Sequence, residues 1–288
     1  SETKPAVSSC HTLLDSLQHI CLMHGMEVDY YKKLFQTIGN IIELIEKDDI
    51  PKYLLFLENA FPYMDNYNYH KGMNGIIQEL KCLLKTKSIG TDSDRALLLD
   101  FQATLETKPE KAIKLEKDAL AQIENITADN ARLVSNLHAN LGGLYRMNGH
   151  PDLAREHMEK SISLLDQFNL LHINDSIPQI ANYAMFLTEQ QEPERGISEL
   201  QKLSGIIKEY HSDDCLDYAK VQETLGTIYL MTANLPQAKT HFKRAFKIYE
   251  KIWADEPEMI EAKYQEIQEL YPQIGFCIGK NLSGLLTK

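Results

Sequence analysis

The chain has 288 residues, of which 43% are hydrophobic and 25% are charged, and its formal net charge is −11. This acidity argues against direct binding of nucleic acid, which needs Lys and Arg to neutralise phosphates, and gives little support to binding at an anionic membrane. No run of about 18 apolar residues predicts a helix that spans a membrane. The five cysteines form no CxxC pair, so they fit free thiols in a reducing cytoplasm rather than a zinc ribbon or redox site.

The N-terminal part, residues 1–92, is expected to be an irregular helical region, either degenerate repeats or a separate subdomain. Helical periodicity predicts helices over 7–26, 30–46 and 72–84, and a further helix that starts at Pro51 and ends at Pro62.

Residues 93–255 are more regular and predict four helix pairs. In each pair a proline lies at or near the start of the second helix, where its missing N–H is harmless. The expected pairs are 94–107 with 109–123, 130–147 with 151–168, 177–190 with 193–210, and 217–231 with 236–253. The remaining segment, 256–288, is expected to be a capping helix over 260–270 followed by a tail.

A spacing of 42 residues runs through these pairs. Small residues recur at this interval, at Ala112, Ala154, Gly196 and Ala238. The pattern Leu-Gly-x-x-Tyr begins at Leu141 and again two periods later, at Leu225. A fixed period between about 20 and 50 residues indicates supersecondary units that stack on one another.

These positions resemble the tetratricopeptide repeat. The fullest copy consists of Leu225, Gly226, Tyr229, Ala238, Phe242 and Ala245. The first copy departs from the pattern, because Asp100 takes the glycine position and Glu116 takes the position of the bulky side chain. The resemblance implies an all-α, right-handed superhelical solenoid of antiparallel helix pairs. The long period is similar to that of kinesin light chains and of bacterial regulators that bind signalling peptides.

In that family the first helix of each pair lines the concave face, and this places the candidate site. The position before the Leu of Leu-Gly holds Asn140, Asn182 and Thr224. An asparagine amide can bind a peptide backbone as both donor and acceptor. The alternative is that these side chains are merely solvated or bond within the repeat. Helical spacing predicts that further residues lie on the same face: Asn136, Arg146, Met185, Thr188, Lys220, Thr227 and Met231.

The sequence therefore predicts a non-catalytic module that binds a protein or peptide, with no cofactor and no metal site. The histidines His150, His157 and His241 are expected at the surface. Because the chain begins with Ser1 rather than Met, we expect it to be a fragment of a larger protein. The family resemblance implies that it is the sensing or scaffolding part of a larger cytoplasmic regulator. The alternative is a self-association module, a homodimer paired through apolar segments such as 53–61 or 270–286, which light scattering would detect.

Overall fold

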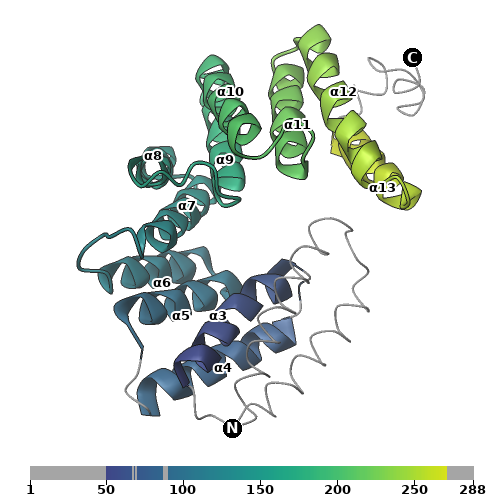
Figure 1. Cartoon of the computed structure of the whole chain (residues 1–288). Coiled ribbons are helices and arrows are strands. Elements are labelled where there is room, and N and C mark those ends of the chain that lie inside the picture. The colour runs from purple at the N-terminus through teal and green to yellow at the C-terminus, as the bar shows by residue number, and fades with distance from the viewer. Residues whose placement is uncertain (1–49, 67, 69, 87–89, 271–288) are drawn as a thin grey trace. The chain divides into compact units, whose positions relative to one another are not determined.

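The computed structural model describes residues 50–66, 68, 70–86 and 90–270, and every regular element within them is an α-helix. The predicted helices over 7–26 and 30–46, and the tail after residue 270, lie outside this part. The helices are α3 (Ile50–Asn66), α4 (His70–Thr86), α5 (Asp92–Leu105), α6 (Pro109–Ala121), α7 (Ala131–Met147), α8 (Pro151–Gln167), α9 (Ser176–Glu189), α10 (Pro193–Tyr210), α11 (Leu216–Met231), α12 (Leu235–Ile252) and α13 (Pro257–Leu270). The prediction of an all-α chain built from helix pairs is confirmed (Figure 1).

The chain divides into two compact units, Ser1–Leu144 and Tyr145–Lys288, and the boundary falls near the end of α7. In the first unit α3 packs on α4, α4 on α5, and α5 on α6. Its main core joins α3, α4 and α5, and the rings of Phe61 and Phe101 stack there with their centroids 3.8 Å apart. A smaller cluster of Ala96, Ala119 and Leu137 joins α5, α6 and α7.

The helix α3 corrects two expectations from the sequence. Pro62 does not end the helix but lies inside it. Proline in a helix interior removes one backbone hydrogen bond, and here Phe61 and Met64 on either side are buried in the core, which offsets that loss. The segment 53–61 is likewise largely buried in this core, with Leu55 as its exposed large apolar side chain, so it offers little surface for pairing two chains.

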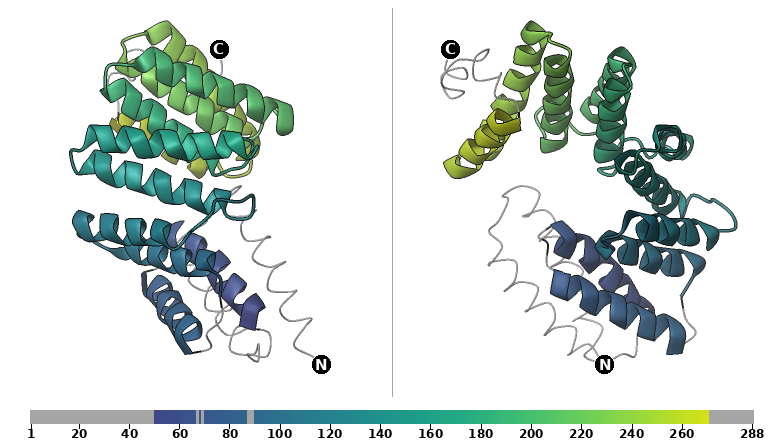
Figure 2. Two further views of the ribbon diagram at one scale, coloured as in Figure 1. Left: turned by 90° about the vertical axis from the view of Figure 1, so that its left-hand side faces the viewer. Right: turned by 180° about the vertical axis from the view of Figure 1, so that it is seen from behind.

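In the second unit consecutive helices pack as antiparallel neighbours. The helix α8 packs on α9, α9 on α10, α11 on both α9 and α10, α12 on α11, and α13 on α12. Within each of the pairs α9–α10 and α11–α12, the two helices lie side by side in both further views (Figure 2). Small residues allow these close approaches. A Cβ added at Gly196 would lie 2.7 Å from the carbonyl oxygen of Ala184, and one at Gly226 would lie 3.0 Å from the Phe242 ring.

The turns inside three helix pairs share one backbone geometry at the same 42-residue spacing. Gly149, Gln191 and Ala233 each have positive φ, at 76°, 66° and 58°. The N–H of the next residue then bonds back to a carbonyl five positions earlier: His150 to Tyr145 at 2.9 Å, Glu192 to Leu187 at 2.8 Å, and Asn234 to Tyr229 at 2.8 Å. This is the Schellman arrangement that ends a helix. The repeat therefore extends to backbone conformation, although only one of the three turn residues is glycine.

Candidate functional site

Two neighbouring helices of the second unit carry the same stripe of positions. On α9 the positions 178, 182, 185 and 189 follow the i, i+4, i+7, i+11 spacing of one helix face. On α11 the same stripe recurs 42 residues later as Lys220, Thr224, Thr227 and Met231. Because α9 and α11 pack directly on each other, these stripes belong to adjacent elements. We call Asn182, Met185, Lys220, Thr224 and Thr227 the α9–α11 stripe.

Asn182 and Lys220 are the members of this stripe whose polar groups are available. Both side chains are exposed. Within the part of the chain that the structure describes, the Asn182 amide has no hydrogen-bond partner and the Lys220 ammonium makes no ion pair. The Asn182 amide can therefore meet a ligand without first breaking a hydrogen bond. The Lys220 ammonium, whose charge also acts on Asp217, can do so without breaking an ion pair.

The other members of the stripe are partly committed to the fold. Met185 is half-buried and packs against the core between α8, α9, α10 and α11, so part of its side chain contributes to packing between the repeats. The hydroxyls of Thr224 and Thr227 donate to the carbonyls four residues earlier, both at 3.0 Å. Thr188, expected on this face, is only 9% exposed and donates to the carbonyl of Ala184. It lies about 120° around the helix from Asn182, so that expectation is wrong.

Arg146 is also occupied, since it binds Glu189 of α9 in a bidentate ion pair. Its Nε donates to Glu189 Oε2 at 2.9 Å, and its Nη2 donates to Glu189 Oε1. Bidentate Arg–carboxylate pairs are among the stronger charge-assisted contacts. In the second unit Arg146 is thus a link between α7 and α9, and a ligand would have to compete with Glu189 for it.

In the first unit, Asn140 lies against a pair of acids, of which Glu116 is buried and Asp100 is half-buried. Its Nδ2 donates to Asp100 Oδ1 at 2.8 Å and faces Glu116 Oε1 at 3.4 Å. Glu116 is only 2% exposed, and its Oε2 has no hydrogen-bond donor. Asn136, one turn earlier on α7, is half-buried. The Asn140 amide NH2 therefore bonds to side chains of the preceding helix pair rather than within its own repeat.

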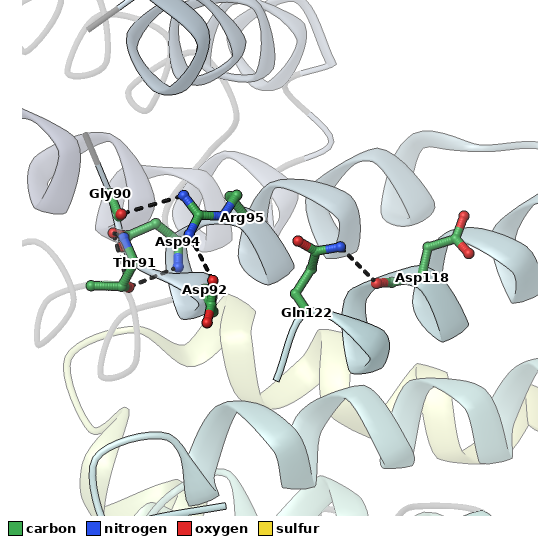
Figure 3. A network of polar contacts seen from close by, with 7 residues as sticks. All are labelled: Gly90, Thr91, Asp92, Asp94, Arg95, Asp118 and Gln122. Atoms are coloured by element: carbon green, nitrogen blue, oxygen red, sulfur yellow. Dashed lines mark hydrogen bonds and ion pairs between the residues drawn. The ribbon is translucent and has the colours of Figure 1, made fainter. Parts of the chain in front are cut away.

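The helices α5 and α6 hold the two acids in place. At the start of α5, Thr91 and Asp94 form a capping box: Asp94 Oδ2 accepts from the Thr91 N–H at 2.6 Å, and Thr91 Oγ1 accepts from the Asp94 N–H at 3.2 Å (Figure 3). Arg95 adds an ion pair to Asp92 at 2.6 Å. Two satisfied N-terminal donors fix where α5 begins. Asp100 follows on this helix and Glu116 on α6, which packs against it.

Burial changes the acidity of this pair. Desolvation, followed by the charge of Asp100, raises the pKa of Glu116 to about 11. Desolvation also raises the pKa of Asp100, with Asp65 of α3 adding to the effect, while hydrogen bonds from Glu116 and Asn140 oppose it. Two carboxyls this close cannot both ionise cheaply. Both shifts favour retention of a proton by the pair.

Comparison with known proteins identifies the repeat. The model of the tetratricopeptide repeat family matches residues 176–251, which span α9, α10, α11 and most of α12. Residues 176–251 are tetratricopeptide repeats. No curated protein matches the sequence.

Solved structures extend the likeness of fold to most of the chain. The apo form of RapI is similar with a TM-score of 0.59 at 14% identity, over 98% of this chain and 77% of that one. A Rap protein complexed with competence and sporulation factor gives 0.52 at 15% identity, over 94% and 76%. The tetratricopeptide-like repeats of a putative kinesin light chain from Podosopora anserina give 0.53 at 12% identity, over 69% and 95%. At these identities the likeness concerns the fold.

The acid pair occupies packing positions of the tetratricopeptide pattern. In the fullest copy the position of Asp100 holds Gly226, and that of Glu116 holds Phe242, whose ring packs on the glycine. The first copy replaces this apolar contact with two carboxyls, and Asn140 of the next copy supplies an amide to them. The sequence signalled the site only as a departure from the pattern, because nothing in the spacing showed that Asn140 would reach both acids.

Glu116→Gln is expected to weaken the dependence of stability on pH. A carboxyl whose pKa is raised on folding, here from 4.5 to about 11, binds more protons in the folded state, so the free energy of unfolding falls as pH rises above the unfolded value. Glutamine keeps the shape without titrating. Urea unfolding should find the variant about 1–2 kcal/mol more stable than the wild type at pH 8, with less difference at pH 5. Equal pH slopes would contradict this account, and the exposed Glu124→Gln is the control.

His241 corrects another expectation, because it is buried and only 7% exposed. Its Nδ1 lies 2.8 Å from Gln222 Oε1, and Gln222 Nε2 donates to Ser204 Oγ at 3.1 Å. Burial lowers the pKa of His241 to about 4, so the ring is neutral at physiological pH. Its ring also stacks on Tyr229, as the half-buried His157 does on Tyr145. His157 and His241 therefore pack within helix pairs, and of the three histidines His150 alone is exposed as expected.

The described residues contain no group of three His, Cys, Asp or Glu side chains able to hold a metal ion. Over the same part of the chain, no helix has the length and apolar character needed to cross a membrane.

Proposed function

We propose that this chain is a non-catalytic tetratricopeptide module that binds a peptide or protein segment on the α9–α11 stripe. The observation that carries the proposal is the contrast between two kinds of repeated position. Gly196, Gly226 and Phe242 serve packing. Asn182 instead keeps an exposed amide with no hydrogen-bond partner among the described residues. Lys220 keeps an exposed ammonium that makes no ion pair there, although its charge acts on Asp217.

The chemistry of these groups fits an extended peptide segment. The Asn182 amide can accept from a peptide N–H and donate to a peptide carbonyl. The Lys220 ammonium can donate to carbonyl oxygens or attract an acidic side chain, although the whole chain is acidic. Met231 lies at the end of α11, one turn beyond Thr227, and is 43% exposed, so it adds an adaptable apolar surface next to the α9–α11 stripe. These features support recognition of main-chain atoms next to one apolar contact.

We further propose that the module is the sensing or scaffolding part of a larger cytoplasmic regulator. The likeness to a Rap protein complexed with competence and sporulation factor supports only the capacity of this fold to hold a ligand. The widely spaced cysteines, without a CxxC pair, support the cytoplasmic location.

The test begins with peptides selected from a random display library on the full chain. Binding of a selected peptide to Asn182→Ala/Lys220→Ala should weaken by about 10- to 100-fold, which corresponds to two lost contacts of about 1 kcal/mol or slightly more each. Fluorescence anisotropy measures the affinity, and urea unfolding should change by no more than about 0.5 kcal/mol.

The matched control is Gln201→Ala/Lys239→Ala, which removes an exposed amide and an exposed ammonium from α10 and α12. It should bind with wild-type affinity. Equal weakening by both double variants, or by neither, would refute the α9–α11 stripe as the binding surface.

A further inference from the structure

The acid pair Asp100 and Glu116 of the first unit determines which polar atom of Asn140 a ligand can reach. Asn140 and Asn182 occupy equivalent positions one 42-residue period apart, and both are exposed. Their surroundings differ. The NH2 of Asn140 faces carboxyl oxygens of Asp100 and Glu116, whereas the Asn182 amide has no partner among the described residues.

The chemistry of the pair determines which way the Asn140 amide points. Two carboxyls that share one proton expose several acceptor oxygens and at most one donor, and that donor is used between them. The amide must therefore turn its NH2 inward. Its Oδ1 accepts no hydrogen bond from a described residue and is not buried without a partner.

We propose that Asp100 and Glu116 share one proton and act as positioning residues that hold the Asn140 NH2 inward, so that this position offers a ligand only a hydrogen-bond acceptor. This inference rests on the proposed peptide-binding function and assigns a ligand chemistry to a position of the first unit, taken by itself. The group that meets Asn140 is a donor: a peptide N–H or, better, the cationic end of a Lys or Arg side chain.

The charges around the pair favour such a donor. With one shared proton, the pair of Asp100 and Glu116 keeps one negative charge next to the Asn140 amide. From α3, Asp65 adds a further acidic group that acts on Asp100, and His70 of α4 acts on Asp65 in turn. The resulting field is negative, which attracts a cationic donor and repels a carboxylate. Asn182 makes no hydrogen bond to a carboxyl among the described residues, so its amide can turn to meet either a donor or an acceptor of a ligand.

The test uses the ligand-free full chain, so that its outcome does not depend on any peptide. By NMR, the side-chain NH2 protons of Asn140 should exchange with solvent about tenfold more slowly than those of Asn182, since charge-assisted hydrogen bonds protect them. Carboxyl 13C shifts of Asp100 and Glu116 should show that one of the two remains protonated at pH 7.

Variants separate positioning from folding. Asp100→Gly/Glu116→Met, which installs the residues found at the equivalent Gly142 and Met158, should bring the exchange rate of Asn140 to within about threefold of that of Asn182. Glu116→Gln, which keeps the shape, should remove the shared proton while the chain stays folded. Circular dichroism checks the fold of both variants.

Equal exchange of the two amides in the wild type, or two carboxyls that are both ionised at pH 7, would overturn this inference and leave the display experiment on Asn182 and Lys220 unaffected. Conversely, if that experiment refuted the α9–α11 stripe, the protected Asn140 amide would still establish the acid pair as a structural feature.

Discussion

Phe242→Ala is expected to lower the free energy of unfolding by about 3–5 kcal/mol, as the loss of a fully buried aromatic side chain does. Phe242 is 2% exposed and belongs to the core formed by α11, α12 and α13. Its ring lies over Gly226, so truncation leaves a cavity against a residue that has no side chain to fill it. Urea unfolding followed by circular dichroism measures the loss.

A double-mutant cycle with Gly226→Ala tests whether the glycine is there for the ring. Alone, the new Cβ would lie 3.0 Å from three ring carbons, so the ring must shift. In the Phe242→Ala background this conflict disappears and alanine favours the helix. The two changes should couple by about 1–2 kcal/mol, with the double variant more stable than the sum of the single effects predicts. Strict additivity would contradict the proposed contact between these two positions.

Gly196→Val is expected to destabilise the chain by about 2–3 kcal/mol, the range of a badly overpacked site. The first atom beyond the glycine Cα would already lie 2.7 Å from the carbonyl oxygen of Ala184 and 3.1 Å from its Cα. These are backbone atoms of α9, which cannot move aside as a flexible side chain can. The effect should appear as a lower midpoint in urea with an unchanged slope.

Gly205→Ala is the matched control, because it lies on the same helix α10 with no atom within 4 Å of the added Cβ. It should stabilise the chain by about 0.5–1 kcal/mol through the helix propensity of alanine. If both glycine substitutions changed stability in the same direction and by similar amounts, Gly196 would not be the close-approach position that the 42-residue spacing indicates.

The fold was largely predictable because the repeat spaces small residues, prolines and apolar positions evenly. The helix pairs appear within a few residues of their predicted bounds. The sequence could not show the left-handed conformation at Gln191 and Ala233, because neither residue is typical of such a turn. It also misplaced the end of α3, where burial of Phe61 and Met64 outweighs the break that Pro62 favours.

The candidate site was less predictable because side-chain partners come from tertiary contacts. Helical spacing placed Asn182 and Lys220 on an exposed face. It could not show that Glu189 binds Arg146, or that Asp100 and Glu116 engage Asn140. His241 was expected at the surface because it lies one position before the packing residue Phe242, yet Gln222 supplies the hydrogen bond that makes its burial tolerable.

Hydrogen–deuterium exchange of the full chain with and without a display-selected peptide tests the central claim most directly. Binding on the α9–α11 stripe predicts that the peptide slows amide exchange in α9 and α11 and leaves α10 and α12 little changed. Protection confined to α10 and α12, with α9 and α11 unaffected, would contradict the account.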